Sequence, residues 1–220
     1  MQLPFTVEQF FGAFRAYNLA VWPAQIALLA LAVTAVVLLF VPKPWSAIGI
    51  SLILACLWTW VGLAYHLAFF ARINPLAYAF AALSVAAAII FVWHGVIRRR
   101  LEFRWNVSFR TICGLALLVF ALLLYPAWSS LSGHNYPAFP TFGLPCPTTI
   151  FTIGVFGFAA APYPRSPIVI PVLWCFVGAQ AAFLLGVHAD LGLIGACLVG
   201  MLLLAKSRVS AFRMEPESKG

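Results

Sequence analysis

The residues best suited to chemistry gather around one polar segment, GHNYPAFPTFGLPCPTT, at residues 133–149. It holds a histidine, a cysteine and two adjacent threonines, but it carries no lysine, arginine or carboxylate. Cys146 stands between two prolines, whereas the other four cysteines lie inside apolar runs. A thiol, an imidazole and hydroxyl groups in one segment could bind a polar ligand, help to hold a metal or supply a nucleophile.

Metal binding is the first of these chemistries. Thiolate and imidazole are ligands that zinc and copper accept, and three histidines with one cysteine would complete a tetrahedral site. The candidate ligands are His66, His134, Cys146 and His188. They come from separate segments without a short spacing such as Cys-x-x-Cys, so the zinc or copper hypothesis depends on the fold to bring them together.

Nucleophilic chemistry is the second. If PCPTT (145–149) begins a helix, its unpaired N–H groups and the helix dipole would favour an anion there, including the Cys146 thiolate. Thr148 and Thr149 would then cap the helix or contact a ligand. A membrane-embedded enzyme that uses this thiolate or a metal-bound water is therefore one hypothesis. The chain has no Gly-x-Ser-x-Gly, His-Glu-x-x-His or phosphate-loop motif, so no catalytic residue is assigned.

The composition indicates where these residues are placed. The chain is 64% hydrophobic and 8% charged, with a mean hydropathy of +1.02. Soluble domains carry about 25% charged residues, so this chain could not cover a water-exposed surface. A lipid bilayer removes that need. The N-terminus lacks the basic-then-apolar order of a signal peptide, and we expect an all-α, polytopic transmembrane helical bundle.

Apolar runs separated by polar and proline-rich breaks predict about seven membrane spans. Their expected ranges are 19–40, 46–70, 75–97, 111–130, 148–161, 168–188 and 190–204. The fifth has about fourteen residues and would reach about 21 Å, less than the ~30 Å of a bilayer core. We therefore expect the polar segment before it to dip into the protein, where other helices cover its backbone.

The N-terminal stretch from Thr6 to Asn18 predicts a short amphipathic helix. Thr6 and Gln9 have the spacing of a capping box. Phe10, Phe11 and Phe14 would form one apolar face, which suits a helix lying in the membrane interface. The expected organisation is residues 1–18 as this interfacial helix, 19–206 as the transmembrane domain and 207–220 as a cytoplasmic tail.

The positive charges predict the orientation. With seven spans, eleven of the thirteen basic residues fall on one side, and only Arg15 and Arg72 fall on the other. The positive-inside rule places the N-terminus outside and the C-terminus in the cytoplasm. The basic side includes a run whose expected role is contact with anionic lipid rather than nucleic acid: Arg98, Arg99, Arg100 and Arg104.

Polar residues gather at the opposite, outer ends of the spans. They are His66, Arg72, His134, Cys146, Thr148, Thr149, His188 and Asp190. Asp190 could cap the last span or pair with Arg72, since charges near apolar depth usually find a partner. The leading hypothesis is an outer-facing polar pocket that binds a small solute or ion, with transport as its use.

A third hypothesis is a structural or assembly role. Gly192, Ala196 and Gly200 recur at every fourth residue of the last span, a spacing that lets helices approach closely. This stripe and the arginine run could bind a partner or form a homo-oligomer.

Several stretches carry a family resemblance, among them FARINP (70–75) and PCPTTIFT (145–152). With PFTVEQFF near the start and LGVHADLGL near the end, the chain resembles an uncharacterised family of bacterial integral membrane proteins, known only as a domain of unknown function. The resemblance implies a multi-pass, all-helical protein of the bacterial inner membrane. It implies no catalytic residues.

Overall fold

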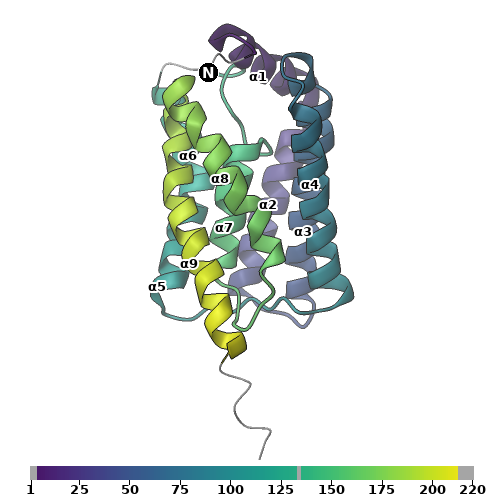
Figure 1. The fold of residues 1–220 in the computed structure, drawn as a ribbon, viewed down its shortest axis with the longest axis vertical. Coiled ribbons are helices and arrows are strands. Elements are labelled where there is room, and N and C mark those ends of the chain that lie inside the picture. The colour runs from purple at the N-terminus through teal and green to yellow at the C-terminus, as the bar shows by residue number, and fades with distance from the viewer. Residues whose placement is uncertain (1–3, 133–134, 213–220) are drawn as a thin grey trace, which may run out of the picture.

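The computed structural model describes residues 4–132 and 135–212, and this part of the chain is helical without a β-strand. The prediction of an all-α chain is confirmed. In chain order the elements are α1 (Val7–Val21), α2 (Ala24–Phe40), α3 (Ser46–Trp60), η1 (Val61–Leu67), η2 (Phe70–Arg72), α4 (Ala77–Phe91), η3 (Val92–Ile97), α5 (Phe109–Val119), η4 (Phe120–Leu124), α6 (Tyr125–Leu131), α7 (Pro145–Phe156), α8 (Ser166–Leu184), η5 (His188–Leu191) and α9 (Gly192–Phe212). Figure 1 shows them as one upright bundle.

Five helical stretches in the described residues are long and apolar enough to cross a membrane. They are Ser46–Arg72, Ala77–Ile97, Phe109–Leu131, Ser166–Leu184 and His188–Ser207. Each coincides, within a few residues, with one of the seven spans expected from the sequence. Three of them contain a π-helical segment, η1, η3 or η4, where the helix widens by one residue per turn.

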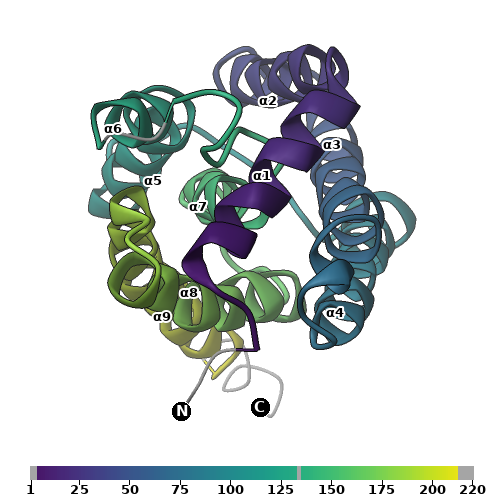
Figure 2. The ribbon, with the colours of Figure 1, turned by 90° about the horizontal axis from the view of Figure 1, so that it is seen from above.

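The first expected span, Leu19 to Phe40, is broken near its start. Helices α1 and α2 meet at an angle of 88°, and residues up to Val21 belong to α1. The cause is Pro23, which has no N–H to donate and forces Trp22 into an extended conformation. Helix α1 therefore lies across one end of the bundle, as Figure 2 shows.

The start of α1 follows its predicted capping box. The Gln9 backbone N–H donates to Thr6 Oγ1 at 3.2 Å, and the Thr6 N–H donates to Gln9 Oε1 at 2.8 Å. The apolar face of α1 packs Phe10, Phe14 and Tyr17 onto the end of the bundle, beside Tyr65. These contacts hold α1 over the helices that surround α7.

Helix α7 occupies the centre of the bundle and the other long helices surround it (Figure 2). Its twelve residues are all buried except Cys146, so protein rather than lipid covers it. Twelve residues reach about 18 Å, too short to span a bilayer alone. The polar segment enters the bundle to reach it, and Leu144 at its end is buried. This agrees with the length argument from the sequence.

Close backbone contact holds α5 against α7. A Cβ on Gly114 would stand 2.7 Å from the carbonyl oxygen of Gly154, and one on Gly157 would stand 2.6 Å from the Cα of Gly114. Both distances are shorter than atoms tolerate. Glycine at these positions therefore allows the two helices to touch along their backbones.

The small-residue stripe of α9 also faces inward. A Cβ on Gly192 would collide with the Phe120 ring, and one on Gly200 would stand 2.5 Å from Val172. Ala196, between them, is completely buried. The expectation that this stripe forms an outer docking or self-association face is wrong, because the protein's own helices cover it.

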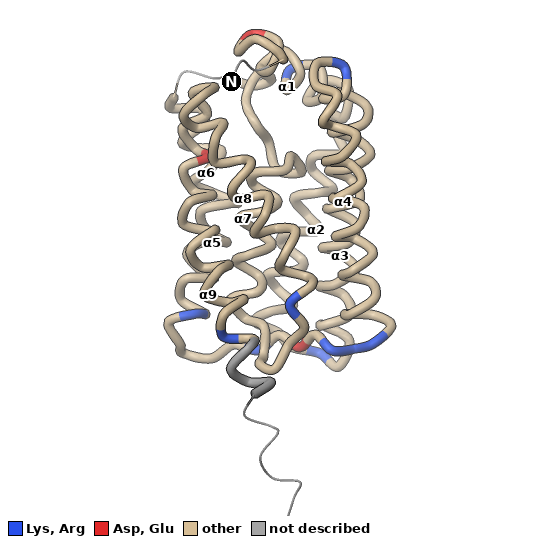
Figure 3. The backbone as a smooth tube through the Cα atoms, in the orientation of Figure 1, with Lys and Arg blue, Asp and Glu red and all other residues tan. Residues whose placement is uncertain are grey.

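The charged residues are unevenly distributed along the bundle. Lys and Arg gather at the end opposite α1, and few lie at the α1 end (Figure 3). The long sides of the bundle between the two ends carry almost no charge, as a membrane-facing surface requires.

Candidate functional site

The candidate site lies where α7 begins, in the half of the bundle nearer α1. The helix starts at Pro145, with Leu144 as its extended N-cap residue and no side-chain cap. Neither Thr148 nor Thr149 caps it, because both come after the first turn has formed; the Thr148 N–H already donates to the Leu144 carbonyl at 3.2 Å. The two hydroxyl groups are therefore available for other partners.

Thr148 Oγ1 and Thr149 Oγ1 are buried, and neither has a hydrogen-bond partner in the described protein. Thr152, one turn later, differs. Its Oγ1 accepts from Trp58 Nε1 at 3.0 Å and donates to the Thr148 carbonyl at 2.7 Å. The threonine hydroxyl deeper in the bundle thus has hydrogen-bond partners, whereas the two hydroxyl groups nearer the start of α7 have none in the described protein.

Asp190 is the carboxylate of this site and is 2% exposed. It accepts a 2.5 Å hydrogen bond from the Tyr125 hydroxyl, at the start of α6, and the Cys146 side chain lies close enough to interact with the same carboxylate. The short 3-10 turn η5 places Asp190 between the ends of α8 and α9. Three segments distant in sequence therefore meet at one buried carboxylate.

The predicted pairing of Arg72 with Asp190 is wrong. Arg72 is exposed, and its guanidinium carbon lies 5.3 Å from the centre of the Phe69 ring. Burying a guanidinium is costly, whereas a phenol and a thiol can donate to a carboxylate without adding charge. Among the described residues, the one ion pair is Arg104 with Glu102, at the other end of the bundle.

His66 is completely buried in the π-helical segment η1. Neither ring nitrogen has a hydrogen-bond partner among the described residues. Aromatic rings surround the imidazole, with centroid distances of 5.1 Å to Trp174, 5.3 Å to Tyr65 and 5.6 Å to Phe80. An imidazole in such a position is a polar group without its usual partners.

Trp174 connects His66 to the start of α7. Its Nε1 is buried without a hydrogen-bond partner in the described protein. That nitrogen and Cys146 Sγ each lie 3.3 Å from the point where a Cβ on Gly178 would stand. Contacts therefore run from His66 through Trp174 and Cys146 to Asp190, and we call this set of residues, with Thr148, Thr149 and Tyr125, the central polar site.

The structure does not bring the remaining predicted residues into this site. Arg72 and His188 are exposed, and His134 lies outside the described residues. No group of three His, Cys, Asp or Glu side chains in the described residues could hold a metal ion. The predicted set of His66, His134, Cys146 and His188 thus lacks a common centre in the part of the chain that the structure describes.

Helix α1 and the polar segment close the site on one side, mainly through Asn18. Its Nδ2 donates to the carbonyls of Pro137 and Phe139 at 2.7 and 2.8 Å. Its Oδ1 accepts from Gln25 Nε2 at 2.7 Å and from Thr141 Oγ1 at 2.8 Å. One buried amide thus fastens the polar segment to the junction of α1 and α2.

A groove of about 290 Å³ lies between α2, the η4–α6 junction and the polar segment. Apolar residues of α2 and η4 form much of its wall, with Gln25, Tyr136 and Thr141 as polar members. Tyr125 also lines it, and the hydroxyl of the same residue donates to Asp190. Tyr125 is therefore shared between the lining of the groove and the hydrogen bond to the buried carboxylate.

The sequence alone did not identify Asn18, Tyr125 or Trp174 as parts of this region. Tyr125 and Trp174 lie in apolar runs, where aromatic residues indicate core packing. Asn18 did offer a signal, since an amide at the start of an apolar run needs partners once it is buried.

Comparison with known protein families assigns the chain to one of them. One family model matches residues 7–215, nearly the whole chain. The chain belongs to DUF6064, a family of unknown function. No curated protein and no solved structure matches this DUF6064 chain. The assignment agrees with the resemblance to a family of unknown function, and it transfers no activity to the residues described above.

Proposed function

We propose that the chain is a seven-pass protein of the bacterial inner membrane that binds a small polar solute or ion in the central polar site. Its apolar helices are compatible with a membrane protein. In this proposal two further helices cross the membrane besides the five long stretches. Helix α2 crosses it after the bend that joins it to α1, and α7 crosses it together with the polar segment that precedes it.

One observation carries the binding proposal: several buried polar atoms without hydrogen-bond partners lie on α7 and on helices packed around it, in a bundle that also buries the Asp190 carboxylate. These atoms are His66 Nδ1 and Nε2, Thr148 Oγ1, Thr149 Oγ1 and Trp174 Nε1. Each buried polar group left unpaired costs about 1–3 kcal/mol. A polar ligand that hydrogen-bonds several of them would recover this energy, which gives the site a reason to bind.

The proposed orientation has the α1 end outside and the arginine-rich end in the cytoplasm. It is supported by the uneven charge distribution in Figure 3, because cytoplasmic loops collect Lys and Arg. In this orientation Arg98, Arg99, Arg100 and Arg104 lie beside the anionic lipids of the inner leaflet. Solute reaches the site from the outer side, with transport across the membrane as its proposed use.

Ligand retention tests this proposal. Protein purified in mild detergent is measured by native mass spectrometry and elemental analysis, with Thr149→Val and Asp190→Asn as site variants. His188→Ala and Arg72→Gln are the matched controls, because both remove a polar outer residue that the site does not contain. We expect the site variants to lose bound ligand by about tenfold or more, the effect of ~1.4 kcal/mol, and the controls to keep it. Equal retention in all five proteins, or none in the unaltered protein, would remove the proposal.

The position of Cys146 disfavours the alternative hypothesis of a membrane-embedded enzyme that uses the Cys146 thiolate. The thiol is buried close to Asp190, and an anionic sulfur there would lie near the carboxylate. We therefore expect Cys146 to react with iodoacetamide near neutral pH more slowly than a thiol introduced at the exposed position Asn135 by Asn135→Cys. Faster alkylation of Cys146, mapped by peptide mass spectrometry, would instead favour a nucleophilic role.

A further inference from the structure

Asp190 is a buried carboxylate without a positive charge beside it. It is 2% exposed, and among the described residues it forms no ion pair. An ionised carboxylate in an apolar interior is costly unless a cation or a proton neutralises it. Ionisable residues inside a membrane bundle usually mark a path for an ion or a proton. The charge of Asp190 therefore requires a positive partner that the described residues do not supply.

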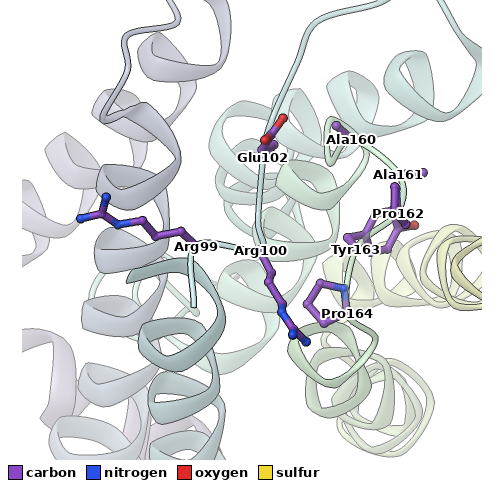
Figure 4. Close-up of a pocket in the computed structure, with 8 residues that line it drawn as sticks. All are labelled: Arg99, Arg100, Glu102, Ala160, Ala161, Pro162, Tyr163 and Pro164. Carbon is purple, nitrogen blue, oxygen red and sulfur yellow. The ribbon is translucent and has the colours of Figure 1, made fainter. Parts of the chain in front are cut away.

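The basic residues lie elsewhere in the bundle. At the α1 end, Arg15 and Arg72 are both exposed. Most other Lys and Arg residues gather at the opposite end, where Arg99 and Arg100 border a cavity of about 470 Å³ (Figure 4). In Figure 4 these two side chains point in different directions. In the part of the chain that the structure describes, no guanidinium group is within ion-pair distance of Asp190.

The titratable side chains packed around Asp190 do not supply a positive charge either. Those that interact with it from other elements are Tyr65 in η1, Tyr125 in α6 and Cys146 in α7. Cys175 of α8 interacts with Cys146, and His188 of η5 is exposed. Tyrosine and cysteine are either neutral or negative, so none of these buried groups can neutralise a carboxylate.

A proton suits these surroundings better than a metal ion. Hard cations bind to several oxygen ligands, and a thiol is a soft ligand. Asp190 has one phenol oxygen beside it, from Tyr125 at 2.5 Å, and the Cys146 thiol close by. A proton needs only one carboxylate oxygen. The Tyr125 hydroxyl donates to Oδ1 and adds a hydrogen bond without adding charge.

A small cavity lies beside the turn that carries Asp190. Its volume is about 10 Å³, and its polar lining residues are Ser129, Ser132 and His188. Ala189, the residue before Asp190, also lines it. Ser129 is 5% exposed, and its Oγ has no hydrogen-bond partner in the described protein. A cavity of about 10–15 Å³ can hold one water molecule, which bonds to buried polar groups that lack partners.

Helix α6 connects this cavity to Asp190. Ser129 comes four residues after Tyr125, so the two side chains are neighbours on one face of the helix. The Tyr125 hydroxyl donates to Asp190. His188, which also lines the cavity, is exposed. The cavity therefore lies between an exposed imidazole and the helix face that contacts the buried carboxylate.

We propose that the ion bound in the central polar site is a proton, which Asp190 takes up from the outer side through the cavity beside Ser129. The inference rests on the proposed function and names its ion. One O–H bond of a hydronium ion breaks, and one O–H bond to a carboxylate oxygen of Asp190 forms. The carboxylate becomes a neutral carboxyl group, and release returns the proton to water. Tyr125 and Cys146 keep their own protons.

Infrared spectroscopy of the protein in detergent tests the proton site. The C=O band of a protonated carboxyl group is recorded at neutral pH, where ordinary exposed carboxyl groups are ionised. We expect a band that Asp190→Asn removes and that disappears in alkaline buffer. Tyr125→Phe keeps the carboxyl group but removes its donor, so it should shift the frequency of this band; it serves as the assignment if Asp190→Asn does not fold. No such band at neutral pH, or a band that alkaline buffer leaves unchanged, would overturn the proposal.

Deuterium exchange tests the route. After transfer to heavy water, the band shifts as deuterium replaces the proton on Asp190. Ser129→Ala removes the buried hydroxyl, and Ser130→Ala is the matched control because the next residue of the same helix is exposed. We expect exchange to slow by about tenfold or more in Ser129→Ala and to stay within about twofold in Ser130→Ala. Equal rates in the two variants would overturn the route through this cavity.

Ligand retention in the same preparation separates this inference from the proposed function. A retained solute without a protonated Asp190 band would overturn the proton site alone. A protonated band in a protein that retains no solute would overturn solute binding alone.

Discussion

Two threonines one turn apart in α7 have opposite hydrogen-bonding situations. Thr149 is buried with an unpartnered hydroxyl, whereas Thr152 both accepts from Trp58 and donates to a backbone carbonyl. Removal of an unpaired buried polar group can stabilise a protein, and removal of a paired one leaves its partner unsatisfied. Comparing Thr149 with Thr152 therefore distinguishes a hydroxyl available for ligand binding from a hydroxyl that stabilises the fold.

We predict that Thr149→Val raises the free energy of unfolding of the ligand-free protein by about 1 kcal/mol, while Thr152→Val lowers it by about 1–3 kcal/mol. Valine keeps the shape and removes only the hydroxyl. Thermal unfolding in detergent measures both. A loss of stability in Thr149→Val as large as that in Thr152→Val would mean that the Thr149 hydroxyl has a structural partner.

The sequence predicted which residues belong to the site better than it predicted which of them contact each other. It singled out Cys146, Thr148, Thr149, His66 and Asp190, and the structure brings these five toward the start of α7. It offered a helix cap or Arg72 as the partner of Asp190 and did not identify Tyr125, because the partner depends on which helices meet. Polar residues are conspicuous in an apolar chain, but their contacts are set by packing.

The contact between α5 and α7 determines where the short central helix lies. Gly114, Gly154 and Gly157 let the two backbones touch, and none of these positions has room for a Cβ. Backbone atoms cannot move aside as the end of a flexible side chain can. A methyl group here must therefore push the helices apart and displace the start of α7.

We predict that Gly114→Ala lowers the free energy of unfolding by about 1–3 kcal/mol, as overpacking does. Gly195→Ala is the control, since a Cβ there would meet no atom within 4 Å. In a helix interior alanine gains about 0.5–1 kcal/mol over glycine, so the control should be neutral or more stable. Equal effects at the two positions, measured by thermal unfolding, would contradict this account of the α5–α7 contact.

Asn18 fastens the polar segment, and its removal should loosen that segment selectively. We predict that Asn18→Ala lowers the free energy of unfolding by about 2 kcal/mol or more, because several hydrogen bonds are lost together. Hydrogen exchange should rise in residues 135–144. Gln9→Ala, which removes one exposed capping interaction, should cost about 0.5–1 kcal/mol and leave exchange in residues 135–144 unchanged. Unchanged exchange in Asn18→Ala would show that other contacts hold the segment.

Periodicity and length predicted most of the elements. Long apolar runs bounded by Pro, Asn or Arg gave five stretches close to the observed ones. The run at 19–40 differed, because Pro23 breaks the helix within an otherwise continuous apolar stretch. The short span was recognised by its length, but its place at the centre of the bundle depends on glycine contacts that one sequence does not reveal.

The distribution of charge along the whole bundle leads to a prediction of topology. A reporter at the C-terminus should be cytoplasmic, and one at the N-terminus should lie outside. Fluorescent protein should therefore be bright when fused to the C-terminus, and alkaline phosphatase should be active at the N-terminus behind an added export signal. The opposite pattern would invert the bundle and place the central polar site in the cytoplasmic half.

The groove beside Tyr125 lies between α2, the η4–α6 junction and the polar segment, while α1 lies across the end of the bundle. An apolar molecule that reaches this groove from the bilayer, unlike the polar solute of the central polar site, is concentrated by the lipid, so its partition coefficient sets its concentration at the groove. Each additional methylene favours the apolar phase by about 0.8 kcal/mol, or about fourfold. Two such molecules with the same head group and different chain lengths would therefore differ in apparent affinity even if the groove itself bound them equally well.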